Sequence, residues 1–390
     1  MYKVFYNDEL LYLPQGANDE HKRGLRDAVL NLAVGSAGSF AFTIDPEHPA
    51  YDALRPLAGI VKVVDQDAAS GASETVFLGR ITRQTTQLDR SLVVECEGVL
   101  ACLNDTLMTP YQFPQNVADL APYQEAAASG NVVEYWLGRL LYLHNSMCWL
   151  DSHKIHLGNV TVSDSNNYIV RAKERTCTIW ETILEDFPRS TLGGYLVARY
   201  DGDDVYLDYL AEFTEISGQQ IAFGENLTDL SGGPEGGDFF NAVLPEGSDG
   251  LTIVSAANGE YEGYYKSGLY LIDTSKRGEY GQICRNIVWN EVTTVSGLLS
   301  KAKAALDAQA GELPSVIKAS AVDMSVIDPT KPRLKIAQLV KVSSRLHGFL
   351  ARYPLMELSI PILDPLSGEV TLGGETASLT GTVSRNNEGT

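Results

Sequence analysis

Cysteine is scarce in this chain of 390 residues and follows no framework pattern. A disulfide framework normally shows an even set of cysteines in a short secreted chain. Here the number is odd, the spacing is wide and no two cysteines form a C-x-x-C pair. We therefore expect free thiols and folding in a reducing cytosol. The five cysteines are Cys96, Cys102, Cys148, Cys177 and Cys284.

Long apolar runs are missing too. No segment approaches the roughly 18 apolar residues that a membrane-spanning helix needs. Residues 1–8 have neither the basic start nor the apolar core of a secretory signal peptide. We expect no membrane span and no signal-directed export.

Basic residues are too few to balance the acids. The chain has 50 Asp and Glu against 30 Lys and Arg, a formal charge of −20. Such a surface repels phosphates and anionic lipid within the Debye length of about 8 Å. Sequence-specific binding of DNA or RNA is therefore not expected. Two explanations of this negative charge are consistent with the sequence. The charge keeps the protein soluble, which is the more common reason, or it belongs to a protein wall along which a polyanion slides without binding.

Motifs of common active sites are also missing. The sequence has no H-E-x-x-H zinc motif and no G-x-S-x-G nucleophile elbow. Residues 232–237 are glycine-rich, but they hold a proline and an acid and precede no helix pattern, unlike a phosphate loop. Asp201, Asp203 and Asp204 lack the spacing of a calcium loop and are typical of a charged hairpin tip. We expect no cofactor, no metal and no catalytic residue.

Three histidines, with one acid beside them, are the nearest approach to a metal site. His144, His153 and His156 lie close in sequence to Asp151, and imidazole with carboxylate suits Zn²⁺. If residues 153–157 form a strand, His153 and His156 face opposite sides and cannot share a metal. Surface or packing roles are the favoured interpretation.

A thiol and an imidazole are also close in sequence. Cys148 follows His144 by four residues and precedes His153 by five, a spacing that would suit a nucleophile and its base. The residues around Cys148, at 147, 149 and 150, are apolar, which raises a thiol pKa and makes it inert. Core packing is the favoured interpretation of Cys148.

The sequence does contain a pattern typical of β-strands. Phe40, Phe42 and Ile44 alternate with small or polar residues, the period of a half-buried strand. Short strands at regular intervals with Gly, Pro and Asp between them predict an antiparallel barrel or sandwich. Further strands are predicted at 60–64, 76–81, 92–97, 154–162, 168–171, 338–343, 355–362 and 369–372, with a hairpin over 196–207 that turns at Asp201-Gly202.

Helices are predicted in three places. Residues 131–144 are apolar at helical spacing on nearly every side, which indicates a buried helix. Thr178 and Glu181 form a capping box that begins a second helix. A third helix is expected over 293–310, ended by Gly311. The glycine-rich segment 231–238 is interpreted as a mobile loop or an inter-domain link.

Tyrosine is abundant, with 19 residues, and gathers between positions 261 and 280. Tyrosine is enriched at protein interfaces and equally at home in half-buried strands. Both interpretations stay open. The cluster consists of Tyr261, Tyr264, Tyr265, Tyr270 and Tyr280.

The length exceeds one hydrophobic core and predicts roughly two to four domains. The order strands, α/β, strands, helix, strands predicts a β-rich α+β fold with two antiparallel β-modules around a mixed α/β centre.

Several short stretches, in this order, resemble the baseplate hub or tail-associated proteins of long-tailed bacteriophages and prophages, a family also labelled prophage tail endopeptidase. The stretches are residues 40–44, 48–54, 77–81, 95–98 with 103–105, 144–145, 193–196, 224–227 and 370–373.

The resemblance implies a homotrimeric ring in the virion tail tip, assembled in the bacterial cytoplasm, through which genomic DNA passes without specific binding. Two β-barrel-like hub modules per chain would join the hexameric tail to threefold tip structures. Implied partners are a distal tail protein ring, the tape-measure protein and a tip or fibre protein. Some members carry C-terminal lysis or receptor-binding extensions; this sequence ends at Thr390, and we expect no such extension and no enzyme.

The domains expected are a first hub module over 1–108, an α/β module over 109–204, a strand-rich segment over 205–250 shared with the second hub module, an α/β segment over 251–312 ending in a helix, and the second hub module over 313–390. Two other functions stay open. One is a tail-associated peptidase or cell-wall hydrolase using His144, Cys148 or His153. The other is a β-protein that binds host glycans through exposed aromatic side chains.

Overall fold

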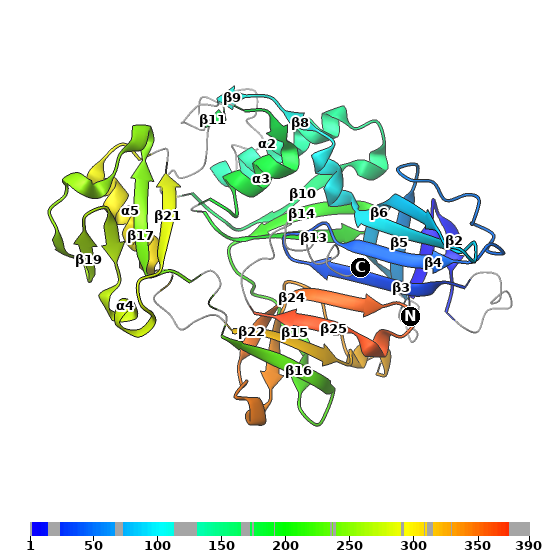
Figure 1. Cartoon of the computed structure of the whole chain (residues 1–390). Coiled ribbons are helices and arrows are strands. Elements are labelled where there is room, and N and C mark those ends of the chain that lie inside the picture. Colours follow the sequence, from blue (N-terminus) through cyan, green and yellow to red (C-terminus); the bar gives the residue numbers. More distant parts are fainter. Residues whose placement is uncertain are drawn as a thin grey trace. The chain divides into compact units, whose positions relative to one another are not determined.

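The computed structural model divides into two compact units (Figure 1). Unit 1 combines Met1–Ser231 with Ile317–Thr390, and unit 2 is Gly232–Val316. The division falls inside the glycine-rich segment, as its interpretation as a link predicts, although its first four residues belong to a strand. The structure describes residues 2–14, 24–66, 73–112, 131–164, 172–173, 175–190, 192–234, 236, 239–289, 292–307, 309, 315–328 and 330–373.

Unit 1 is built on a 13-stranded sheet. Neighbouring strands run antiparallel from β22 to β2, and a side branch adds β23 to β24 and then β15, parallel, to β23. In sheet order the strands are β16 (Leu227–Pro234), β22 (Ser315–Ala321), β25 (Glu369–Leu372), β24 (Arg352–Pro361), β3 (Arg26–Ala33), β4 (Ser39–Ile44), β7 (Leu92–Gly98), β6 (Ser73–Thr86), β5 (Ile60–Gln66), β1 (Tyr2–Tyr6) and β2 (Glu9–Tyr12), with β15 (Ile216–Ala222) and β23 (Leu339–Ser343) on the branch.

The residues of β4 that the sequence pattern predicts to be buried are buried in the structure. Phe40, Phe42 and Ile44 are buried, and the Phe40 and Phe42 rings lie 5.2 Å apart between centroids. The core they enter also holds apolar side chains of β22, β23, β24 and β25. The β-rich α+β class predicted from the sequence is confirmed.

The strands from the two ends of the chain meet in the middle of the sheet. β24 pairs with β3, with Leu358 opposite Leu32 and Ile360 opposite Leu30. The early and late β-modules are therefore hydrogen-bonded to each other along their edges and share one core.

The mixed centre of unit 1 packs two helices beside a small sheet. Helix α2 (Val132–Met147) contacts β10, and α3 (Ile179–Asp186) contacts α2. The sheet has the order β10 (Ile155–Val160), β14 (Asp204–Leu210), β13 (Tyr195–Asp201). Two-stranded pairs join β8 (Leu107–Met108) to β12 (Cys177–Thr178) and β9 (Tyr111–Gln112) to β11 (Ala172–Lys173).

Unit 2 is a five-stranded sheet with a helix against it. Helix α5 (Val295–Asp307) packs on β17, and its Leu298, Leu299 and Ala302 enter the core. The strand order is β18 (Gly259–Tyr261), β19 (Tyr264–Ser267), β20 (Tyr270–Ile272), β17 (Ala242–Gly247), β21 (Cys284–Trp289), and α4 (Thr274–Tyr280) follows β20.

Several local predictions need correction. The hairpin turn is Gly202-Asp203, one residue later than predicted, because Asp201 still pairs with Asp204 and Gly202 alone takes a positive φ. Residues 99–104 form a 3₁₀ helix after β7. Short helix α4, capped by the Asp273 side chain, was not predicted. The predicted strand 168–171 and the Gly311 cap lie outside the described residues.

The capping box at α3 is half formed. The Thr178 hydroxyl accepts a hydrogen bond from the Glu181 N–H at 3.0 Å, as predicted. The Glu181 carboxylate does not reach back, because it pairs with Arg175 at 3.1 Å. A nearby cation is a stronger partner for a carboxylate than a neutral N–H.

Candidate functional sites

The structure brings the thiol and imidazole of the sequence prediction together. Cys148 follows the last turn of α2, and its N–H bonds to the His144 carbonyl. The Cys148 Sγ lies 3.1 Å from His144 Nε2. His144 is 1% exposed and its Nδ1 lies 2.8 Å from the Thr106 hydroxyl.

The hydrogen bonds of His144 oppose a role as general base. Its Nε2 also lies 3.1 Å from the carbonyl oxygen of His153, which can only accept. The tautomer that satisfies both bonds carries its proton on Nε2 and accepts from Thr106 at Nδ1, so no lone pair is left for the Cys148 proton. Burial raises the pKa of the Cys148 thiol and lowers the pKa of His144, which keeps both groups neutral.

The remaining histidines do not assemble a metal centre. His153 ends a 3₁₀ turn before β10 and is not part of that strand. His156, on β10, stacks near Tyr206 with 5.3 Å between ring centroids and lies 3.6 Å from Asp204. Within the described ranges, no group of three His, Cys, Asp or Glu side chains is placed to hold a metal ion.

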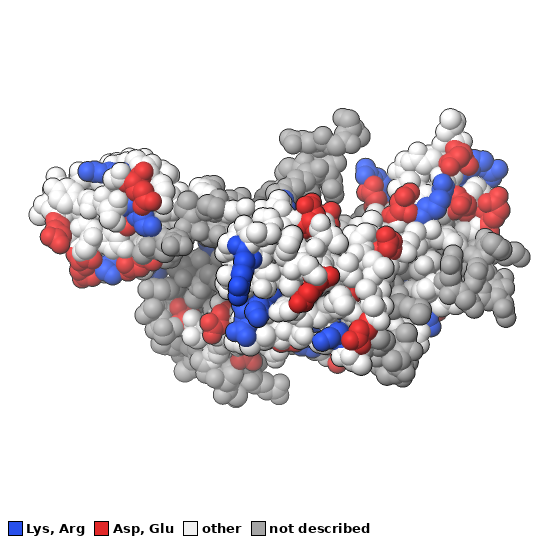
Figure 2. Space-filling model, turned by 90° about the horizontal axis from the view of Figure 1, so that it is seen from below, with Lys and Arg blue, Asp and Glu red and all other residues white. Residues whose placement is uncertain are grey.

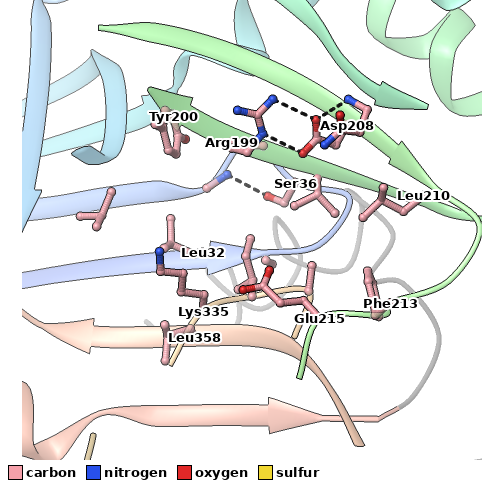
Figure 3. A pocket seen from close by; sticks show the side chains of 18 of the residues that line it. Leu32, Ser36, Arg199, Tyr200, Asp208, Leu210, Phe213, Glu215, Lys335 and Leu358 are labelled. Atoms are coloured by element: carbon pink, nitrogen blue, oxygen red, sulfur yellow. Dashed lines mark hydrogen bonds and ion pairs between the residues drawn. The ribbon is translucent and has the colours of Figure 1, made fainter. Parts of the chain in front are cut away.

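A cleft of about 820 Å³ opens between the large sheet and the β13–β14 hairpin (Figure 3). Its apolar lining includes Leu32 and Leu358 from the large sheet and Leu210 and Phe213 at the end of the hairpin. Polar side chains lie around it, and Figure 3 shows Arg199 directed at Asp208 on the hairpin wall.

Four charged side chains of the cleft form two pairs with one another. Arg199 Nε donates to Asp208 at 3.0 Å, and the same carboxylate accepts from the Asn159 N–H at 2.7 Å. Lys335 pairs with Glu74 at 2.7 Å. A nucleophile beside a free base, the arrangement that covalent catalysis requires, is not found among the residues that line this cleft.

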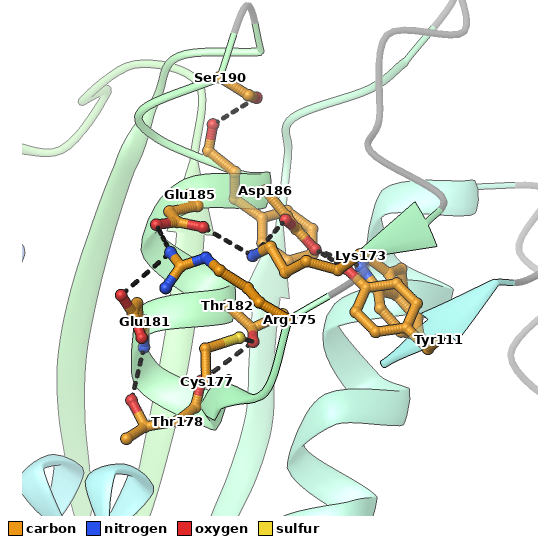
Figure 4. A network of polar contacts seen from close by, with 12 residues as sticks. Tyr111, Lys173, Arg175, Cys177, Thr178, Glu181, Thr182, Glu185, Asp186 and Ser190 are labelled. Atoms are coloured by element: carbon orange, nitrogen blue, oxygen red, sulfur yellow. Dashed lines mark hydrogen bonds and ion pairs between the residues drawn. The ribbon is translucent and has the colours of Figure 1, made fainter. Parts of the chain in front are cut away.

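A second polar cluster is buried under α3 (Figure 4). The carboxylate of Asp186 is fully buried and accepts from the Tyr111 hydroxyl at 2.6 Å and the Trp136 indole at 3.1 Å. Lys173 lies 3.1 Å from Asp186 and 2.8 Å from Glu185. These contacts tie α2, α3, β9 and β11 together, which is a structural role.

Sequence reasoning did not find this cluster. Asp186 is the last residue of α3, where an acidic residue is usually exposed. Its hydrogen-bond partners, Tyr111 and Trp136, are far from it in the sequence. No local pattern marks such a residue, because its burial depends on how α2 and the β9–β11 pair cover it.

The described helices include none that is long and apolar enough to cross a membrane.

Comparison with known proteins finds similarity in structure without similarity in sequence. No protein-family model matches the chain, and no curated protein matches its sequence. A tail protein from Neisseria meningitidis MC58 superimposes with a TM-score of 0.55 at 14% identity, over 96% of each chain. The 43 kDa tail protein of prophage MuSo2 from Shewanella oneidensis gives 0.53 at 12% identity, over 95% of this chain and 97% of that one.

A third solved structure has a similar fold. Prophage tail protein gp18 from Listeria monocytogenes EGD-e gives a TM-score of 0.52 at 9% identity, over 99% of this chain and 98% of that one. The chain has the fold of phage tail proteins. The resemblance inferred from the sequence is thus confirmed at the level of the fold, across nearly the whole length.

Proposed function

We propose that this chain is a structural baseplate hub protein of a long-tailed phage, located in the virion tail tip. The observation that carries the proposal is the shared fold, which covers at least 95% of this chain in each of the three tail proteins. Coverage of this extent includes both units, so the whole chain has the architecture of a tail component.

In this proposal three copies close a ring. Residues 1–108 and 313–390 supply the two β-modules of each copy, the second module shares the strand-rich segment 205–250, and 109–204 and 251–312 are the intervening segments. The continuous pairing through β3 and β24 supports a rigid wall, because the two modules cannot separate without breaking that ladder. The ring would contact a distal tail ring, the tape-measure protein and a tip or fibre protein.

Genomic DNA would pass through the ring without specific binding. Tight binding to DNA requires Lys and Arg that displace counterions from phosphates. A chain of net charge −20 supports a lumen without such contacts. A ring with a predominantly basic lumen would contradict this part of the proposal.

Native mass spectrometry of the purified chain tests the ring. We expect a species with three times the 42.4 kDa mass of one chain, and threefold symmetry in images of the tail tip. A chain that stays monomeric at micromolar concentration, and a single copy in the particle, would refute the proposal.

A peptidase is the second candidate, since Cys148 Sγ and His144 Nε2 lie only 3.1 Å apart. The neutral state of this pair predicts that it is inert. Labelling with iodoacetamide at neutral pH should modify exposed Cys284 much faster than Cys148. Preferential labelling of Cys148, together with cell-wall hydrolysis that Cys148→Ser abolishes, would favour the enzyme instead.

A further inference from the structure

The hairpin formed by β23 and β24, residues 339–354, carries cations that lack acidic partners. We call it the basic hairpin. Lys341, Arg345 and Arg352 are exposed on it, and none forms an ion pair with any residue that the structure describes. The nearby acid Glu225 instead accepts from Gln220 at 3.1 Å. Unpaired cations gathered in a chain of net charge −20 are unexpected, because many acids compete for each one.

Two of these cations face each other across the strands. Lys341 is directly opposite Arg352 in the antiparallel register, so both side chains lie on the same face. Like charges in directly opposed positions destabilise a strand pair. An acidic partner would relieve this repulsion, which gives the basic hairpin a reason to bind one.

The end of the basic hairpin is apolar and exposed. Leu346 is 77% exposed and Leu350 is 59% exposed. Phe223, 57% exposed, extends this surface from the end of β15, where its ring meets His347 edge-on at 6.1 Å. Exposed aromatic rings and arginines are enriched at protein–protein interfaces, and the two exposed leucines add apolar area beside them.

Strands β15 and β24 lie in the lower part of Figure 1, and Figure 2 is a view from below. Figure 2 shows Lys and Arg side chains near the middle of this face, with some Asp and Glu side chains close by. The register itself places Lys341 and Arg352 side by side.

We propose that the basic hairpin docks on an acidic surface of a second copy of this chain, an inference that rests on the proposed ring. A threefold ring closes through head-to-tail contacts, in which each copy presents two different surfaces that complement each other. Copies of charge −20 repel at long range, so one of the two surfaces must supply local positive charge. The basic hairpin supplies it, and its apolar end adds buried area that salt does not screen.

An anionic membrane is the alternative that the charge argues against. Three cations attract anionic lipid weakly, and the net charge of the whole chain opposes its approach to the surface. The test therefore includes lipid vesicles as a separate arm.

The experiment compares two double variants with the same chemistry. Arg345→Glu with Arg352→Glu reverses two charges on the basic hairpin. Arg55→Glu with Arg90→Glu makes the same change at exposed arginines elsewhere in unit 1, which also form no ion pair with described residues. Native mass spectrometry and sedimentation measure the trimer, and far-ultraviolet circular dichroism follows thermal unfolding.

We expect the hairpin variant to weaken self-association about 100-fold, and the control variant to weaken it less than threefold. At a concentration where both chains are monomeric, the unfolding temperature of the hairpin variant should be unchanged or higher than that of the wild type, because Arg352→Glu places an acid opposite Lys341. A loss of trimer is therefore not a loss of folding. Wild-type association should also weaken as salt rises.

The outcomes separate the two proposals. A wild-type chain that never associates overturns the ring and this interface together. A wild-type trimer that survives in the hairpin variant overturns the interface alone. Binding of the wild type to phosphatidylglycerol vesicles that the hairpin variant loses, with its trimer intact, would assign the surface to lipid instead.

Discussion

Asp186 offers the sharpest test of how the mixed centre of unit 1 is held together. Replacing it by alanine removes the acceptor of two donors, the hydroxyl of half-buried Tyr111 and the buried Trp136 indole. Each buried donor left without a partner costs about 1–3 kcal/mol, so we expect a loss of about 3 kcal/mol in the free energy of opening of α3. Asp201→Ala, at the exposed hairpin tip, should change it by less than about 0.5 kcal/mol.

Asparagine separates hydrogen bonding from charge at the same position. Its carbonyl oxygen can accept from Tyr111 and Trp136, and Lys173 keeps its 2.8 Å ion pair with Glu185. Removing one partner of a buried ion pair is costly mainly when the other charge is left uncompensated, and here Glu185 still compensates Lys173. We expect Asp186→Asn to cost less than about 1 kcal/mol at pH 7.

The cost of asparagine should also depend on pH. Burial raises the pKa of Asp186 above its usual value of 3.8, although the hydrogen bond from Tyr111 and the charge of Lys173 oppose this. The native carboxyl therefore keeps a proton that the unfolded chain has lost, and its stabilising effect falls as pH rises through the window above 3.8. Asparagine does not titrate, so the free energy of opening that the variant loses relative to the wild type should be smaller at pH 7 than at pH 4.

Hydrogen exchange of α3 amides, read by mass spectrometry, is the assay, because it reports the opening of this helix and not of the whole chain. A cost of about 3 kcal/mol corresponds to a loss of protection of roughly 100-fold. A loss under tenfold in Asp186→Ala, or equal losses in the alanine and asparagine variants, would refute the reasoning.

Two further variants test the large sheet. Phe40→Ala should lower the free energy of unfolding by about 3–5 kcal/mol in urea, because the ring is fully buried, whereas Leu88→Ala at an exposed turn should leave it unchanged. Gly98→Ala should destabilise the β7 end strongly, since a Cβ there would lie 1.8 Å from the Ala37 carbonyl oxygen, while a Cβ at Gly233 meets nothing within 4 Å. Thermal unfolding of the matched glycine variants checks the second prediction, and equal unfolding temperatures would contradict it.

The sequence predicted the parts of this fold that follow local rules. The alternation of Phe40, Phe42 and Ile44 shows which side of β4 is buried, because neighbouring side chains in a strand point to opposite faces. Thr178 marks the start of α3, because its hydroxyl satisfies an N–H only three residues away. Where a competing partner exists, as Arg175 does for Glu181, the local rule fails.

The candidate sites were less predictable. Spacing along the chain placed Cys148 near His144, but the His144 tautomer is fixed by the carbonyl of His153, which lies outside α2. The neutrality of both groups follows from their burial in the tertiary structure. The cleft and the Asp186 cluster have no sequence signature, since each is assembled from segments that are distant in the chain.

The amino-acid pattern determines which stretches of this protein are strands or helices and which of their faces are buried, because those preferences act over a few residues. The pairing of β24 with β3, the burial of Asp186 and the exposure of Lys341 opposite Arg352 arise only once distant strands choose their neighbours. That choice depends on which edges and apolar faces fit together across the whole unit, and no short window of sequence contains that information.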